Sequence, residues 1–169
     1  MTSTSFLPTP ALEHVLDLDV SVDAPIDAGI LTGLGTQGRR RIIPITGGVV
    51  SGQYQGQRIQ GRVLPGGADF QRVPGDTCAD LDARYLIALD GDFAGEHIFV
   101  MNRALRRASA EDVARLLKGE PVDPARVYFR CAPVFEVSSP HLQWLVEHIV
   151  IGTGARAPNC VKISFYIVK

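Results

Sequence analysis

The sequence predicts an all-β protein, a mostly antiparallel barrel or sandwich with one short helix. Short extended segments recur along the chain and are separated by glycine, proline, aspartate and asparagine, which is typical of hairpin-connected strands. Only the residues near 110–118 have convincing helix signals. The chain has 169 residues, 46% of them hydrophobic, which is enough for one core. We therefore expect a flexible segment over residues 1–10 and a single domain over residues 11–169.

The first strands are predicted by the alternation of apolar and polar residues. Residues 12–22 alternate with a period of two, which indicates a strand with one solvated face. Residues 42–53 form a second extended stretch, in which a proline and a glycine pair indicate an edge or a bulge. A short extended stretch over residues 59–64 ends at a Pro-Gly-Gly break.

The clearest strand covers residues 81–89. Its alternation places Tyr85 among the apolar residues of one face and Asp82 with Arg84 on the other. The helix near 110–118 is supported by Ser109 as N-cap, by acidic residues in its first turn and by a glycine after its last turn. Further extended segments are expected over residues 96–102, 127–137, 144–152 and 161–168.

The composition argues against several classes of partner. Lys and Arg total 17 against 18 Asp and Glu, a balance that disfavours binding to nucleic acid or to an anionic membrane surface. We interpret the three arginines at 39–41 as a solvated strand entrance or as charge at the mouth of a ligand site, rather than as a nucleic-acid patch. No apolar run approaches the ~20 residues that span a bilayer, and residues 1–10 do not resemble a signal peptide. We expect a cytoplasmic protein.

Neither a metal nor a cofactor is predicted. The three cysteines Cys78, Cys131 and Cys160 have long, irregular separations, and the four histidines show none of the spacings that hold a metal ion. Residues 33–38 match GxGxxG in letters, but an extended pattern follows them instead of a long helix, so a dinucleotide site is not expected. Any chemistry is therefore expected from side chains alone.

Residues 61–71 gather polar side chains around a glycine turn, namely Arg62, Asp69 and Gln71. Glycine lets the backbone approach a ligand closely, although the same letters are also ordinary turn chemistry. We expect the turn to hold Asp69 at a barrel mouth, where apolar neighbours such as Phe70 raise its pKa.

Two features of the strand over residues 81–89 bear on a site. Tyr85 is expected to point into the barrel, where a buried phenol normally finds a polar partner. Arg84 either forms a surface ion pair with Asp82 or binds an anion.

The segment 127–137 places charges within an aromatic run. Arg130 and Glu136 interrupt this run, and charges among apolar neighbours are costly unless they are matched. We predict that Arg130 binds a substrate anion; the alternative is a structural pair with Glu136, Asp69 or Asp82. Phe135 and Trp144, the sole tryptophan, are candidates for substrate contact, and Trp144 is equally well explained as a core residue.

Several of these motifs occur together and in one order: the turn segment 61–71, the strand 81–85 followed by Asp90 and Gly91, and the segment 128–136. In these features the chain resembles the DUF3237, or UPF0311, family of small β-barrel proteins. The resemblance implies a compact barrel, similar in outline to lipocalins, with a polar-lined cavity and a homo-oligomeric assembly. The chain differs from the family pattern in having Phe70 at the place of a tryptophan and a longer turn over residues 92–95.

For a barrel of this kind we expect a cofactor-independent enzyme that acts on a small oxygenated or aromatic metabolite by general acid/base chemistry. Isomerisation, cyclisation, lyase cleavage and lactone hydrolysis would all suit such groups. The alternatives are a barrel that binds an acidic small molecule without chemistry, and a structural subunit. The predicted catalytic residues are Asp69 as base, Tyr85 as proton donor or oxyanion partner and Arg130 as anion clamp, with Arg62, Gln71, Arg84, Phe135 and Trp144 in contact with substrate.

Overall fold

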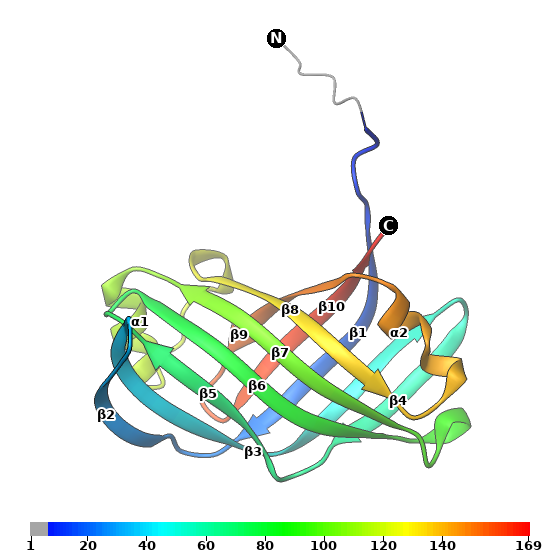
Figure 1. Cartoon of the computed structure of the whole chain (residues 1–169), viewed down its shortest axis with the longest axis horizontal. Helices are drawn as coiled ribbons and strands as arrows, with labels where there is room; N and C mark the ends of the chain where they lie inside the picture. Colours follow the sequence, from blue (N-terminus) through cyan, green and yellow to red (C-terminus); the bar gives the residue numbers. More distant parts are fainter. Residues whose placement is uncertain (1–6) are drawn as a thin grey trace.

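The computed structural model describes residues 7–169, which form a barrel of strands (Figure 1). Of the segment expected to be flexible, residues 1–6 lie outside the described residues, whereas residues 7–10 are exposed and belong to no strand. In this part of the chain the strands are β1 (Leu12–Val22), β2 (Ile26–Gly33), β3 (Thr36–Tyr54), β4 (Gln57–Val63), β5 (Gly67–Val73), β6 (Cys78–Leu89), β7 (His97–Arg107), β8 (Tyr128–Val137), β9 (Val150–Arg156) and β10 (Cys160–Val168).

The strands close into the predicted antiparallel barrel, which has eight strand positions. β1, β10, β9, β8, β7 and β6 follow one another around the wall. β3 completes the ring, because its C-terminal half lies between β1 and β4 and its N-terminal half between β2 and β5. β1 and β2 thus share one position, as do β4 and β5. Among the described strands, β2 pairs with β3 alone.

Alternation along the strands fills the barrel, as predicted for β6. Its inward residues Leu81, Tyr85 and Ile87 are at most 3% exposed, whereas Arg84 is exposed on the outer face. The bulge expected near the glycine pair is also present, since the pairing of β1 with β3 shifts where Ser21 and Val22 face Gly47 and Ile45.

The predicted helix is α1 (Ala110–Leu117). Its N-cap is Ser109, whose hydroxyl oxygen accepts from the backbone N–H of Asp112 at 3.1 Å. Short helical segments also connect the strands: η1 (Gly91–Phe93), η2 (Pro124–Arg126), η3 (Pro140–Leu142) and α2 (Trp144–Glu147). Over residues 7–169, none of the helices has the length and apolar character needed to cross a membrane.

The sequence reading was wrong over residues 144–152. α2 occupies the first part of this segment, and β9 begins only at Val150. The hydroxyl of Ser139 accepts from the backbone N–H of His141 at 3.1 Å and starts the helical turns. Leu142 and Leu145 are then spaced by three residues, which places both against the core. Over so short a stretch, this pattern resembles alternation.

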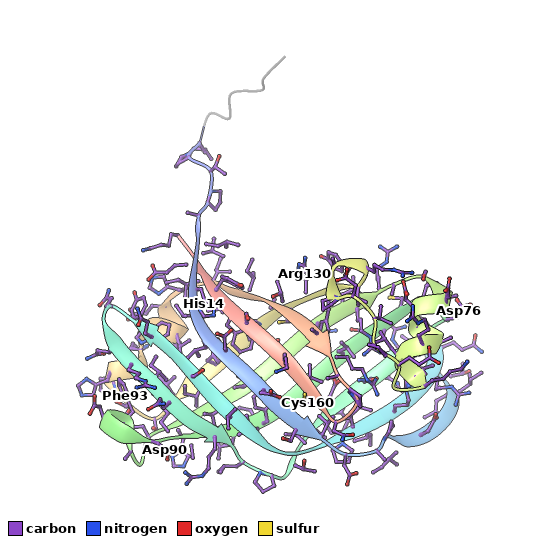
Figure 2. All side chains as sticks on the ribbon, turned by 180° about the vertical axis from the view of Figure 1, so that it is seen from behind. His14, Asp76, Asp90, Phe93, Arg130 and Cys160 are labelled. Atoms are coloured by element: carbon purple, nitrogen blue, oxygen red, sulfur yellow. The ribbon has the colours of Figure 1, made fainter. Side chains whose placement is uncertain are left out.

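The two ends of the barrel differ (Figure 1). α2 lies at one end, where Phe93, Leu142 and Leu145 are buried in the main core cluster and fill the interior. α1 and β2 lie at the opposite end, and Figure 2 shows Asp76 there and Asp90 with Phe93 at the filled end. The name "α1 end" is used below for the end that holds α1 and β2.

Candidate functional site

A cavity of about 50 Å³ lies inside the barrel. Because a site of roughly 10–15 Å³ on this scale holds one water molecule, the cavity admits a few waters or the reacting end of a substrate. Most of its wall is apolar, with β-branched side chains of β1, β3 and β10 and the ring of Phe129. Six polar side chains also line it: Asp69, Gln71, Tyr85, Asn102, Arg106 and Arg156.

Asp69 lies on β5 and faces this cavity. The expectation that a turn holds it was incomplete: Gly66, with a φ of +110°, makes the turn, and the next residue begins a strand. Phe70 points the other way and is 45% exposed, so it does not desolvate the carboxylate. The strand pairs with β3 on one side and with β6 on the other, which fixes the direction of the Asp69 side chain.

Two hydrogen bonds orient the Asp69 carboxylate. Gln71 Nε2 donates to Oδ2 at 2.7 Å, and the backbone N–H of Asp82 donates to Oδ1 at 3.1 Å. Burial raises the pKa of Asp69 above its usual value and outweighs the lowering by these bonds and by the charge of Arg106. Asp69 is therefore an oriented carboxylate with increased proton affinity.

Tyr85 extends into the cavity from β6 and is 2% exposed. Its hydroxyl has no hydrogen-bond partner among the described residues. Burial raises the pKa of Tyr85, and the nearby Cys131 and Asp69 raise it further. The phenol thus stays protonated at neutral pH and has a free O–H to donate.

Two amide side chains at the cavity also have unused hydrogen-bonding atoms. Oε1 of Gln71 and Oδ1 of Asn102 are buried without a partner in the part of the chain that the structure describes. Buried polar groups are normally satisfied, and leaving one unpaired costs about 1–3 kcal/mol. Together with Tyr85, these atoms give the cavity several polar groups available to a ligand or to water.

Three arginines cluster at the α1 end, and of these sequence reasoning had considered Arg41 alone, as one of three charges at a strand entrance or ligand mouth. Arg106 and Arg156 line the cavity, and Arg41 is only 7% exposed beside them. A signal was present for Arg41, which continues the alternation of the inward residues Ile43 and Ile45. Residues 39–41 are therefore not one block of equivalent charges, because alternation sends Arg41 inward and Arg40 outward.

The predicted place of Arg130 inside the barrel was wrong. It lies on the outer surface (Figure 2), where its Nη1 donates to the Phe129 carbonyl at 3.0 Å and its guanidinium stacks over the Tyr128 ring at 5.2 Å. The physical reason is alternation, because the inward positions of β8 are taken by apolar side chains such as Phe129 and Cys131. Glu136 is exposed on the same outer face.

Two further arginines expected to contact substrate are also exposed and paired on the outside. Arg62 binds Asp90 at 2.8 Å, and Arg84 forms the surface pair with Asp82 at 3.4 Å. Of Asp69, Asp82 and Glu136, the carboxylates considered as partners for Arg130, only Asp69 lines the cavity.

The two aromatic candidates lie away from the cavity. Phe135 is buried and packs edge to face on Phe165, with ring centroids 5.6 Å apart. Trp144 stacks on Tyr54 at 4.1 Å and packs against the core, which matches the alternative reading of this residue. Within residues 7–169, no three His, Cys, Asp or Glu side chains are grouped to hold a metal ion.

The sequence of this chain is similar to one protein family and to several curated proteins. The family described as "Protein of unknown function (DUF3237)" matches residues 10–168. A UPF0311 protein of Rhodopseudomonas palustris strain TIE-1 is 40% identical over 162 residues, covering 95% of this chain and 99% of that protein. One from Clostridium acetobutylicum is 38% identical over 157 residues, 93% of each chain.

Solved structures agree with the fold. A conserved protein of unknown function from Rhodopseudomonas palustris superposes with a TM-score of 0.83 at 37% identity, over 96% of this chain and all of that one. A "beta-barrel like protein" from Acinetobacter baumannii gives 0.77 at 34% identity, over 98% of this chain and all of that one. An enzyme from Penicillium herquei gives 0.64 at 19% identity, over 98% of this chain and all of that one, which shows the fold alone. With the family match and the close relatives, this chain belongs to the DUF3237 family of UPF0311 barrel proteins.

Proposed function

We propose that the protein is a cofactor-independent enzyme that performs general acid/base chemistry on a small oxygenated or aromatic metabolite in its barrel cavity. The observation that carries the proposal is that two suitable side chains, Asp69 and Tyr85, line the same small cavity. Asp69 is oriented and has a raised pKa, and Tyr85 has a free O–H. A base and an oxyanion donor in one desolvated site are the parts that proton transfer needs.

The two groups take different roles. Asp69 accepts a proton from a carbon or oxygen acid, or from an attacking water, because its raised pKa strengthens it as a base. Tyr85 keeps its proton because burial raises its pKa, so it serves better as a hydrogen-bond donor to a developing oxyanion than as an acid. Isomerisation, cyclisation, lyase cleavage and lactone hydrolysis all use such a pair.

The test uses two probes that report on these steps. In D₂O, proton NMR follows exchange of the enolisable protons of phenylpyruvate, and absorbance follows the ring opening of dihydrocoumarin. We expect the wild-type protein to accelerate at least one reaction, and Asp69→Asn to slow it by roughly 10²–10⁴-fold, the usual contribution of a positioned base.

The matched control is Asp82→Asn. Asp82 lies on the outer face, and its contact with Asp69 is through the backbone N–H, which the substitution retains. Equal rates for wild type and Asp69→Asn would remove Asp69 from catalysis.

The second candidate function is a barrel that binds an acidic small molecule without turnover. The apolar wall of the cavity and the arginines beside it favour this reading. It is supported if ligands bind equally to wild type and to Asp69→Asn and neither protein changes them chemically.

A further inference from the structure

We propose that Arg41, Arg106 and Arg156 form a subsite at the α1 end of the cavity that binds the oxyanion group, a carboxylate or a phosphate, of the ligand. The inference rests on the proposed function only in placing a ligand in this cavity, and it holds whether or not the ligand is turned over. The name "arginine triad" is used below for these three residues.

Strand register brings the triad to one face. The three residues lie on β3, β7 and β9, which are not neighbours in the barrel wall. In antiparallel pairs, directly opposed residues point to the same side of the sheet. The partners opposite the triad all line the cavity: Gln71 faces Arg41, Phe129 faces Arg106 and Val161 faces Arg156.

The triad has no carboxylate ion-pair partner in the part of the chain that the structure describes. Within residues 7–169, none of its members forms an ion pair, whereas seven other arginines do: Arg39, Arg62, Arg72, Arg84, Arg103, Arg115 and Arg126. Arg41 and Arg106 are nevertheless each only 7% exposed, and the Nε of Arg41 is buried without a hydrogen-bond partner. Such burial of unmatched charge is costly unless an anion completes the site.

The carboxylates nearby do not neutralise the triad. Asp69 acts on all three arginines electrostatically, but its two oxygens are held by Gln71 and by the backbone of Asp82. Asp27 also acts on Arg41, and its carboxylate is paired with Arg39 at 2.8 Å. Three guanidinium groups therefore face one cavity carboxylate, which leaves positive charge in excess.

Electrostatics within the triad agrees with this excess. Burial, followed by the charges of Arg156 and Arg41, lowers the pKa of Arg106 to about 10. Burial followed by repulsion from Arg41 also lowers the pKa of Arg156. An oxyanion among the three removes this repulsion, and planar guanidinium groups suit the paired oxygens of a carboxylate or a phosphate.

The surroundings of Arg156 leave room for the rest of a ligand. Arg156 also lines a groove of about 240 Å³ outside the barrel, formed by the segment that follows α1 and by Ala157 and Pro158. The cavity of about 50 Å³ is too small for a whole aromatic metabolite. A ligand held at the triad would thus have one end beside Asp69 and Tyr85 and its remainder in this groove.

Calorimetric titration in low-salt buffer tests the subsite with three matched probes: benzoate, phenylphosphonate and the neutral benzamide. We expect at least one of the two anions to bind the wild-type protein and benzamide to bind at least tenfold more weakly. Stronger binding of benzoate identifies a carboxylate site, and stronger binding of phenylphosphonate a phosphate site.

Variants then locate the binding. Arg106→Gln and Arg156→Gln are each expected to weaken anion binding roughly 10-fold or more, because each removes charge-assisted hydrogen bonds. Arg103→Gln is the matched control, since Arg103 lies on β7 with Arg106 but faces outward with its side chain 72% exposed. Melting curves establish that each variant is folded. If Arg106→Gln does not fold, Arg156→Gln alone decides the test, because Arg156 is the most exposed residue of the triad.

The outcomes separate this inference from the proposed function. Asp69→Asn should retain anion binding while turnover is lost, because it removes a negative charge and leaves the triad in place. Anion binding without turnover in any protein would overturn the enzyme proposal alone. The subsite is overturned if neither anion binds, if benzamide binds as tightly as the anions, or if Arg106→Gln and Arg156→Gln bind them like the wild type.

Discussion

Asp69 illustrates how its surroundings set the behaviour of one carboxylate. Burial favours the protonated form, while Gln71, the Asp82 backbone and Arg106 favour the ionised form. Burial is the larger effect, so the pKa is raised even though three partners oppose it. The same partners orient the carboxylate, and the site thus combines a fixed geometry with a strengthened base.

The raised pKa has a consequence for stability. The folded protein holds the Asp69 proton more tightly than the unfolded chain does, so the stability associated with this group is present at low pH and is lost as the pH rises through the folded-state pKa. We expect Asp69→Asn to have a higher melting temperature than the wild type at pH 8, and we expect this difference in melting temperature to shrink towards pH 4. Thermal melts across this range measure it. If the wild type is more stable than Asp69→Asn at pH 8, the attraction of the ionised Asp69 carboxylate to the arginines outweighs the cost of its burial.

At Tyr85, stability and activity should separate. The hydroxyl is buried without a partner among the described residues, so Tyr85→Phe removes an unsatisfied group and keeps the ring. We expect the free energy of unfolding to stay within about 1 kcal/mol of the wild type or to rise, and the probe reactions to slow. Denaturant unfolding and probe rates give the two readouts. A large loss of stability would mean that an ordered water satisfies the phenol.

At the scale of elements, β5 positions the base, and Gly67 allows β5 to lie where it does. A Cβ at Gly67 would stand 2.5 Å from the Arg84 carbonyl oxygen and 2.7 Å from the Tyr85 Cβ. We expect Gly67→Ala to separate β5 from β6, to cost on the order of 1–3 kcal/mol of stability and to lower probe rates as Asp69 moves.

Gly75 provides the control in the same region of the chain. A Cβ there meets nothing within 4 Å, so Gly75→Ala should change stability by no more than about 0.5 kcal/mol. Denaturant unfolding of both variants measures the difference. Equal effects at the two glycines would contradict the close approach of β5 to β6.

At the scale of the whole molecule, β2 is a mostly exposed edge strand. Within residues 7–169 it pairs with β3 alone. Its neighbouring residues Ile30 and Leu31 are 66% and 51% exposed, so both faces of the strand meet solvent. A free edge strand with exposed apolar side chains is a surface on which a second copy can pair. We therefore expect a homo-oligomer that uses β2.

Light scattering after size-exclusion chromatography tests this expectation. The wild type should contain more than one subunit, and Ile30→Lys should shift it towards the monomer. Val134→Lys is the matched control, because Val134 is 60% exposed on the outer face of β8. A monomeric wild type, or an oligomer that Ile30→Lys leaves intact, would show the expectation to be wrong.

The sequence by itself determined an all-β fold, because alternation and turn residues are local signals that each strand carries alone, and the resemblance to the family favoured a barrel over a sandwich. It placed Tyr85 inside, with Arg84 on the opposite face of the same strand, located α1 and the bulge beside the glycine pair, and marked Asp69 and Gln71 among its candidates. It did not resolve α2, where helical spacing and alternation coincide over a few residues.

Only the tertiary structure decided which charges meet. Arg130 was singled out for its aromatic neighbours, yet Phe129 and Phe135 take inward positions of β8 and Arg130 is left in solvent beside Tyr128. Arg41 and Arg156 are 115 residues apart in the chain. They meet with Arg106 because the N-terminal part of β3 and the C-terminal ends of β7 and β9 lie at the α1 end of one closed barrel. Local patterns determine which face a side chain takes, but the identity of its neighbours across a barrel depends on strand order and register, which no single segment encodes.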